Sequence, residues 1–174
     1  MPVIDTRIQP QSDDFVRNSQ HMAQMLRAVR ELEARTRDRS AQARPLFDKR
    51  GQLLPRERIA LLLDPGASYL ELSALAGFGM DHPDPAKCIP GAGIITGIGW
   101  VAGTRCMVVA SDSGIEAGSI RAMGLEKILR AQQIALDGAG VAGDVGGAAR
   151  HLEAGGLAVD VADHAAAVEA CFRI

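Results

Sequence analysis

The most regular stretch of the chain reads PGAGIITGIGWVAGTRCMVVA and covers residues 90–110. Apolar, partly β-branched residues fill two segments of it, from Ile94 to Val101 and from Cys106 to Val109. Such segments are typical of strands. The tetrapeptide Ala102-Gly103-Thr104-Arg105 lies between them and supplies a turn. The stretch therefore predicts a β-hairpin in which Cys106 is a small buried side chain.

A long helix is predicted before this hairpin, in an arm rich in arginine. Ser12 precedes Asp13 and Asp14, a sequence typical of a helix N-cap and first turn. Apolar residues then recur at intervals of three and four, which predicts an apolar stripe that faces a partner. The arginines of the arm are interpreted as a solvated face. The stripe comprises Met22, Met25, Leu26, Val29 and Leu32.

Shorter elements are predicted on either side of the hairpin. Pro55 suits the first turn of a helix that runs to Leu63, and the turn Asp64-Pro65-Gly66 ends it. Residues 69–72 predict a brief strand. A further helix is expected from about Ile120 to Leu136, because apolar residues recur along it.

Composition excludes several classes of protein. The 174 residues leave room for one domain with an appended arm. A net charge of −2 and 3% aromatic residues argue against nucleic-acid binding through bulk charge or aromatic platforms. No apolar run approaches a membrane span, and the first residues do not form a signal peptide. The sequence therefore predicts a cytoplasmic protein.

Neither a metal site nor a nucleophilic triad is predicted. His82 and Cys88 are the only histidine and cysteine close in sequence, and they lack a second pair of ligands. The glycines of Gly91-Ala92-Gly93 precede a strand instead of opening a helix, which argues against a dinucleotide loop. Residues 114–124 are more informative, because a glycine-bearing loop between a strand and a helix can present backbone N–H groups to a ligand.

Three blocks of sequence together resemble a known family. The carboxyltransferase β subunits of biotin-dependent acyl-CoA carboxylases, which include the propionyl-, methylcrotonyl- and geranyl-CoA carboxylases, carry similar blocks in the same order and with similar separation. The resemblance covers about residues 10–137. The blocks are Arg56-Glu57-Arg58-Ile59 with Leu62-Leu63-Asp64-Pro65-Gly66, then residues 90–99 (PGAGIITGIG), then Gly124-Leu125-Glu126-Lys127 through Arg130-Ala131-Gln132.

The resemblance implies a crotonase-like α/β fold of the ClpP/crotonase superfamily, with stacked sheets and helices packed outside them. It also implies transfer of a carboxyl group from carboxybiotin to the α-carbon of an acyl-CoA, with backbone N–H groups stabilising the enolate. The implied partners are a biotin carboxylase and biotin carrier subunit, and other copies of the chain through carboxyltransferase domains. The acyl-CoA is the substrate, biotin is carried on the partner, and no metal is implied. Residues expected nearest the CoA are Ser113, Gly114, Gly118 and Met123.

The chain departs from the family pattern after Leu136. The family continues there into another buried strand and an oxyanion loop, whereas this chain gives Asp137-Gly138-Ala139-Gly140 and an Ala- and Gly-rich run. Gly146-Gly147 imitates an oxyanion loop, but no apolar strand is expected before it. We therefore expect a helical arm at 1–46, the start of a carboxyltransferase N-domain at 47–137, and a divergent tail at 138–174. Such a chain is expected to be an N-terminal fragment, altered by truncation or a change of reading frame and inactive alone.

Two alternatives remain open from the sequence. A non-catalytic assembly subunit would keep the arm and the hairpin as packing surfaces. An enoyl-CoA hydratase or isomerase of the same superfold would need a catalytic carboxylate beside an oxyanion loop, and Glu116 is the candidate near the right loop.

Overall fold

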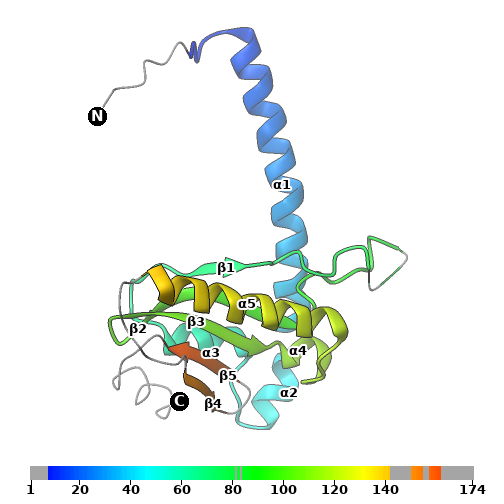
Figure 1. The fold of residues 1–174 in the computed structure, drawn as a ribbon. Helices are drawn as coiled ribbons and strands as arrows, with labels where there is room; N and C mark the ends of the chain where they lie inside the picture. The colour runs from blue at the N-terminus through cyan, green and yellow to red at the C-terminus, as the bar shows by residue number, and fades with distance from the viewer. Residues whose placement is uncertain (1–7, 81, 83, 142–149, 155–156, 162–174) are drawn as a thin grey trace.

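The fold is built on one five-stranded antiparallel sheet, seen in a computed structural model that describes residues 8–80, 82, 84–141, 150–154 and 157–161. The spatial order of the strands is β1-β2-β3-β5-β4 (Figure 1). The strands are β1 (Leu70–Leu72), β2 (Ile94–Val101), β3 (Thr104–Ser111), β4 (Arg150–Ala154) and β5 (Leu157–Val161).

The predicted hairpin is confirmed, with a tighter turn than expected. β2 and β3 pair in register from Ile94 opposite Ser111 to Val101 opposite Thr104, so Thr104 and Arg105 belong to the strand. The turn contains only Ala102 and Gly103, with φ values of 49° and 76°. The two carboxylate oxygens of Asp64 each accept one N–H of these residues at 2.7 Å. These two hydrogen bonds hold the turn in place. A two-residue turn in which both residues are left-handed is favoured in tight hairpins.

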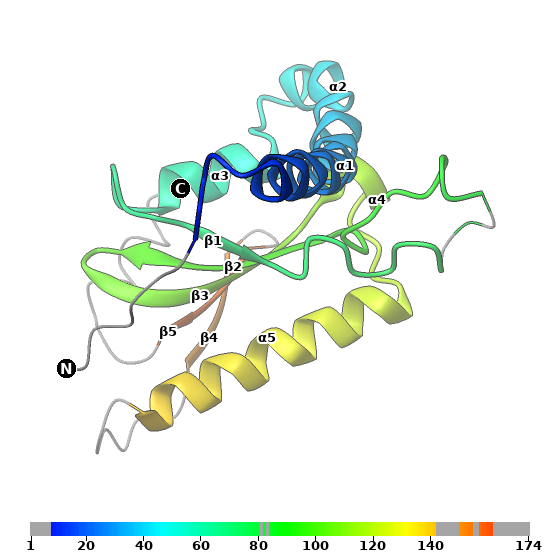
Figure 2. The same ribbon diagram turned by 90° about the horizontal axis from the view of Figure 1, so that it is seen from above.

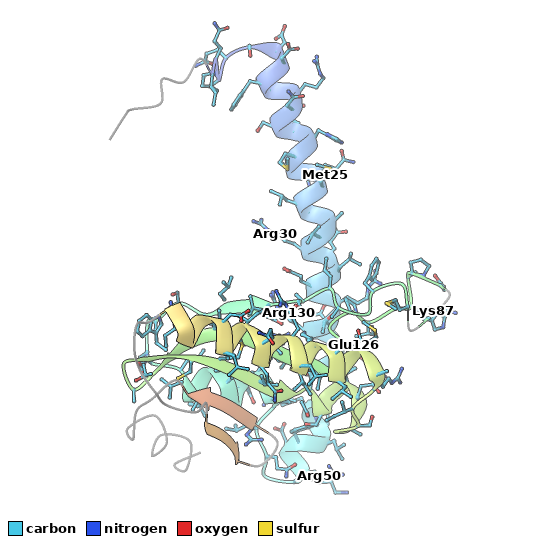
Figure 3. All side chains as sticks on the ribbon, viewed as in Figure 1. Met25, Arg30, Arg50, Lys87, Glu126 and Arg130 are labelled. Atoms are coloured by element: carbon cyan, nitrogen blue, oxygen red, sulfur yellow. The ribbon has the colours of Figure 1, made fainter. Side chains whose placement is uncertain are left out.

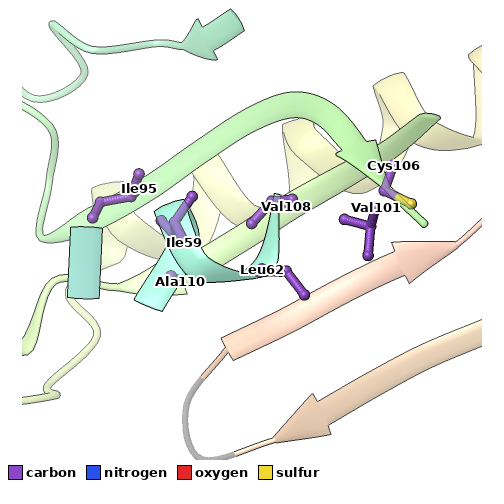
Figure 4. Close-up of a cluster of buried hydrophobic side chains, with 7 residues drawn as sticks. All are labelled: Ile59, Leu62, Ile95, Val101, Cys106, Val108 and Ala110. Carbon is purple, nitrogen blue, oxygen red and sulfur yellow. The ribbon is translucent and has the colours of Figure 1, made fainter. Parts of the chain in front are cut away.

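Helices cover both faces of the sheet (Figure 2). Alternate residues of β3 point to opposite faces. Cys106, Val108 and Ala110 pack with Ile59 and Leu62 of helix α3 (Pro55–Leu62), in the cluster drawn in Figure 4. Cys106 is 1% exposed, which confirms its prediction as a buried side chain. The other face is covered by helix α5 (Ala122–Val141), and the residues packed there include Ile94, Met107, Val109 and Ala131.

The N-terminal arm forms helix α1 (Asp13–Ala41), which stands out from the sheet (Figure 1). The Ser12 hydroxyl accepts the Phe15 N–H at 3.3 Å, which confirms the predicted N-cap. Only the last turns dock on the body, where Thr36 and Ser40 are buried. A short helix, α2 (Arg44–Lys49), follows and leads toward α3.

Two arginines of the arm contact the body; Arg35 corrects the solvated-face interpretation, whereas Arg37 stays exposed as expected. The Arg35 guanidinium donates to the carbonyls of Pro85 and Cys88 at 2.8 and 3.0 Å. The Arg37 guanidinium lies 3.9 Å from the Glu71 carboxylate. Both residues sit where α1 meets the body, so long-range contacts engage charges that the helical pattern alone places toward solvent.

Helix α5 is longer than expected and continues to Val141, with no proline to interrupt it. The expected boundary between residues 137 and 138 falls inside this helix, and the division of the chain into three regions stays a prediction.

After α5 the chain adds two strands to the sheet: β5 pairs with β3, and β4 pairs with β5. Gly146 and Gly147 lie outside the described residues. Among the described residues, no helix has both the length and the apolarity to cross a membrane.

Two glycines of α5 give a matched test of this packing. A Cβ on Gly124 would lie 2.9 Å from the Ala92 carbonyl oxygen and 3.2 Å from Ile94 Cγ1, whereas one on Gly138 would meet nothing within 4 Å. We expect Gly124→Ala to lower the free energy of unfolding by about 1–3 kcal/mol, because backbone must move. Gly138→Ala should raise it by about 0.5–1 kcal/mol through helix propensity. Urea denaturation of both variants measures this, and equal effects would contradict it.

Candidate functional site

The four residues expected near the CoA lie between the end of β3 and the first turn of α5. Ser113 and Gly114 open helix α4 (Ser113–Glu116), a single turn where the sequence predicts a loop. Gly118 has a φ of +88°, is exposed, and has open space where a Cβ would stand. Met123 lies in the first turn of α5 and is partly buried. Gly118 therefore stays apart from the buried part of this region.

Gly114 allows α4 to pack directly on the end of α1. A Cβ at this position would lie 2.8 Å from both the carbonyl oxygen and the hydroxyl oxygen of Ser40. The Ser40 hydroxyl in turn donates to the Asp112 carboxylate at 2.5 Å. The close approach therefore joins the arm, the end of β3 and α4 at one point.

The turn Gly91-Ala92-Gly93 lies beside this point and has three consecutive left-handed residues, with φ values of 99°, 54° and 68°. The Gly91 N–H donates to the Ala76 carbonyl at 2.9 Å, and the Asp112 N–H donates to the Gly93 carbonyl at 2.8 Å. The sequence predicts that these glycines precede a strand, and the structure places them directly before β2. Ala92 has a Cβ and adopts this conformation at a cost in backbone strain.

The Lys127 ammonium holds this turn from the side of α5. Its Nζ donates to the Ile94 carbonyl at 2.6 Å and to the Gly91 carbonyl at 3.2 Å. The residue is 5% exposed. Burial lowers the pKa of Lys127 from its ordinary value to about 8, partly opposed by the charge of Glu71.

An ion pair lies across the same region. The Arg56 guanidinium binds the Glu71 carboxylate through two hydrogen bonds of 2.8 Å each. This two-point geometry is the strong form of an arginine–carboxylate contact. Burial is the largest single effect and raises the pKa of Glu71. The Arg56 hydrogen bonds, together with the charges of Arg56, Arg37 and Lys127, outweigh burial, so the net shift of this pKa is downward.

Two polar atoms in this region are buried without a partner among the described residues: Arg56 Nε and Asp112 Oδ2. Burial raises the pKa of Asp112, and the Ser40 hydrogen bond works against this rise. Both side chains line a cavity of about 10 Å³, together with Glu71, Gly91 and Gly93. That volume suits about one water molecule, and the two atoms offer it a donor and an acceptor.

The sequence analysis missed the buried charged cluster, which we define as Arg56, Glu71, Asp112 and Lys127. Two of its four members had a local signal in the sequence. Glu71 is a charge inside the apolar strand 69–72, and Lys127 lies in phase with Ala131 and Ile134 on the inner face of α5. A charge within an apolar stripe indicates a buried partner, but the pattern does not name that partner.

Glu116 is the candidate catalytic residue of the hydratase alternative, and its carboxylate forms an ion pair. Its carboxylate lies 3.0 Å from the Arg121 guanidinium. Its side chain also crosses Gly93, where a Cβ would stand 2.7 Å from Glu116 Cγ. The carboxylate that a hydratase would use as an acid or base is thus paired with a cation.

Comparison with known proteins gives the class of this fold. The chain is 51% identical to the β subunit of geranyl-CoA carboxylase from P. aeruginosa, with a TM-score of 0.70 over 78% of this chain and 25% of that one. The architecture is therefore the crotonase-like α/β fold of a carboxyltransferase β subunit. The described residues form one sheet of it, where the resemblance implies stacked sheets.

Comparisons of the sequence lead to the same class of protein as the comparison of structures. Residues 48–160 match the family described as "Carboxyl transferase domain", and the chain belongs to this family. The chain is 51% identical over 94 residues to the beta1 subunit of the biotin-dependent 3-methylcrotonyl-coenzyme A carboxylase of Mycobacterium tuberculosis, a span of 54% of this chain and 17% of that protein. It is 39% identical over 134 residues to the probable mitochondrial methylcrotonoyl-CoA carboxylase beta chain of Drosophila melanogaster, covering 76% and 23%. The chain thus spans less than a quarter of either curated relative.

The lowered pKa of Lys127 predicts a pH dependence. Between its folded pKa of about 8 and its ordinary value of 10.5, the unfolded chain binds a proton that the folded chain does not. The free energy of unfolding should therefore rise with pH in this window, by about 3 kcal/mol at most. Lys127→Met should abolish this rise, whereas Arg130→Met, an exposed residue of the same helix, should keep it. Chemical denaturation from pH 7 to pH 10.5 measures it, and parallel profiles for all three proteins would contradict it.

Proposed function

We propose that the chain provides part of the carboxyltransferase component of an acyl-CoA carboxylase. The observation that carries this proposal is the family match over residues 48–160, which includes the hairpin, the Gly91–Gly93 turn and α5. The reaction is transfer of a carboxyl group from carboxybiotin to the α-carbon of an acyl-CoA. The proposed partners are a biotin carboxylase and biotin carrier subunit, and further copies of the chain.

The cavity lined by Arg56, Glu71 and Asp112 is too small for either substrate. Its volume of about 10 Å³ compares with the roughly 300 Å³ of a small-molecule site. A biotin ring or an acyl chain does not fit there, so no step of the transfer is assigned to these residues. In the proposal, Ser113, Gly114, Gly118 and Met123 form one wall of the acyl-CoA site, and the cluster beneath them fixes its backbone.

The physical role of this wall is positioning. Stabilising an enolate requires N–H donors held in place before the reaction, so that no reorganisation is needed as the charge develops. The Lys127 bonds to the Gly91 and Ile94 carbonyls, and the Ser40 bond to Asp112, fix the backbone on either side of α4. The cytoplasmic location expected from the sequence remains a prediction.

A non-catalytic assembly subunit is a second candidate. It is favoured by the exposed apolar side chains on the outer side of α5, which present a packing surface without any pocket. These residues are Leu125, Leu129 and Leu136, each at least half exposed.

The isolated chain provides a first test. We expect calorimetry with acetyl-CoA and propionyl-CoA to show no micromolar binding, and we expect no carboxylation when a biotinylated partner subunit is supplied. The physical reason is that one wall buries little of a ligand, and that each missing oxyanion donor costs about 3 kcal/mol at the transition state. Micromolar binding together with turnover would overturn the expectation that the chain is inactive alone.

A chimaera tests the carboxyltransferase role directly. Residues 48–137 of this chain would replace the matching segment of the P. aeruginosa β subunit, which is 51% identical. We expect the chimaera to keep carboxylation activity. Within it, Met123→Ala should raise the KM for the acyl-CoA about tenfold through lost apolar contact, while Leu129→Ala, exposed on the same helix, should not. A folded but inactive chimaera would favour the assembly subunit, and equal KM effects would remove Met123 from the site.

A further inference from the structure

The two ends of α1 differ in what they contact. Figure 3 shows Met25 and Arg30 on the part of the helix that stands clear of the sheet, whereas Thr36 and Ser40, near its other end, are buried. Both buried side chains carry a hydroxyl group, and a buried hydroxyl group needs a hydrogen-bond partner. The partners of these two groups therefore show what the docked end of the arm holds in place.

Both partners lie directly before a segment of the candidate site. The Thr36 hydroxyl donates to the Pro90 carbonyl at 2.9 Å, and Pro90 directly precedes the Gly91–Gly93 turn. The Ser40 hydroxyl donates to the Asp112 carboxylate at 2.5 Å, and Asp112 directly precedes α4. The last two turns of α1 thus bind the chain where the turn begins and where α4 begins.

The position of α4 depends on what this short helix packs against. It is a single turn of four residues, and a helix this short is not stable in water through its own hydrogen bonds. A Cβ on Gly114 would lie 2.8 Å from the Ser40 carbonyl oxygen, so α4 packs directly on the arm. The ion pair between Glu116 and Arg121 joins two residues of the same connection and does not attach it to the body. The docked arm is therefore a main support of α4.

The Gly91–Gly93 turn has a second support. Lys127 of α5 donates to the Gly91 and Ile94 carbonyls, in addition to the bond that Thr36 makes just before the turn. Loss of the arm contacts should thus release α4 more than it releases the turn.

We propose that Ser40 and Thr36 are positioning residues, through which docking of the arm orders α4. Ser40 acts on α4 through Asp112 and through direct packing on Gly114, and Thr36 secures the neighbouring turn. For its consequence in acyl-CoA binding the inference rests on the proposed function, in which Ser113 and Gly114 form part of the acyl-CoA wall. A shift of the arm then changes acyl-CoA binding without any contact between the arm and the substrate.

Amide hydrogen exchange of the full chain, resolved by NMR, tests this coupling. The Ile115 and Glu116 N–H groups of α4 both donate to the Asp112 carbonyl and serve as reporters. Ser40→Ala should speed their exchange about tenfold, because a buried carboxylate loses a donor, while amides in the middle of β2 and β3 keep their rates. Ser19→Ala, the same substitution at an exposed position of α1, should change neither set of rates.

Two further variants keep the test decisive if Ser40→Ala does not fold. Thr36→Val removes the hydroxyl at nearly constant shape and should speed exchange of the Gly91 N–H by less than tenfold, because Lys127 still holds the turn. Gly114→Ala displaces α4 from the arm and should speed exchange in the last turn of α1, since coupling is reciprocal. Unchanged α4 rates in the Ser40 variant, or equal acceleration across β2, β3 and α5, would overturn the proposal.

The consequence for acyl-CoA binding is measured in the chimaera, extended to carry residues 13–137 of this chain. Ser40→Ala should raise the KM for the acyl-CoA about tenfold and leave kcat within about twofold, because the wall binds the substrate without reacting. Ser19→Ala should change neither constant. A loss of kcat at unchanged KM would contradict the positioning role. Exchange is measured without substrate, so an inactive chimaera contradicts the proposed function and leaves the coupling to be decided by the exchange rates.

Discussion

The Lys127 ammonium ties the longest helix of the body to the strained turn at the end of the sheet, and much of the structure depends on this contact. Burying a charge is costly unless hydrogen bonds and opposite charges compensate for it. Two carbonyl oxygens and the nearby Glu71 carboxylate provide that compensation. The same contact fixes how α5 lies on the sheet and keeps the Gly91–Gly93 turn in a conformation that Ala92 would not adopt alone.

Close backbone approach is the second constraint on this fold, and glycines allow it. Gly97 and Gly99 on β2 lie beneath Tyr69 and Leu63, where any Cβ would stand 2.4 Å from a side-chain atom. Gly114 does the same for the end of α1. Because these positions carry no side chain, the arm, the sheet and both helical layers pack closer to one another than ordinary side chains would permit. Two of these close contacts adjoin the buried charged cluster, because Gly97 pairs with Glu71 and Gly114 follows Asp112 by two residues.

Two helices, α1 and α5, present apolar side chains outward. α5 packs Ala131 against the sheet and leaves Leu125 and Leu129 about half exposed. Exposed polar residues such as Arg130 stand among these leucines. α1 likewise leaves Met22 about half exposed.

Local signals in the sequence determined the hairpin at 94–111, the Ser12 cap, the helix that begins at Pro55, and the family resemblance, because each rests on residues close together along the chain. They did not determine the last residue of α5, nor the length of the hairpin turn, which the carboxylate of Asp64 anchors. Tertiary structure alone brought Arg56, Glu71 and Asp112 to one cavity and placed the Lys127 ammonium within reach of their charges. Their spacing along the chain carries no periodicity, and a buried charge takes whichever partner the folded backbone brings within hydrogen-bond distance.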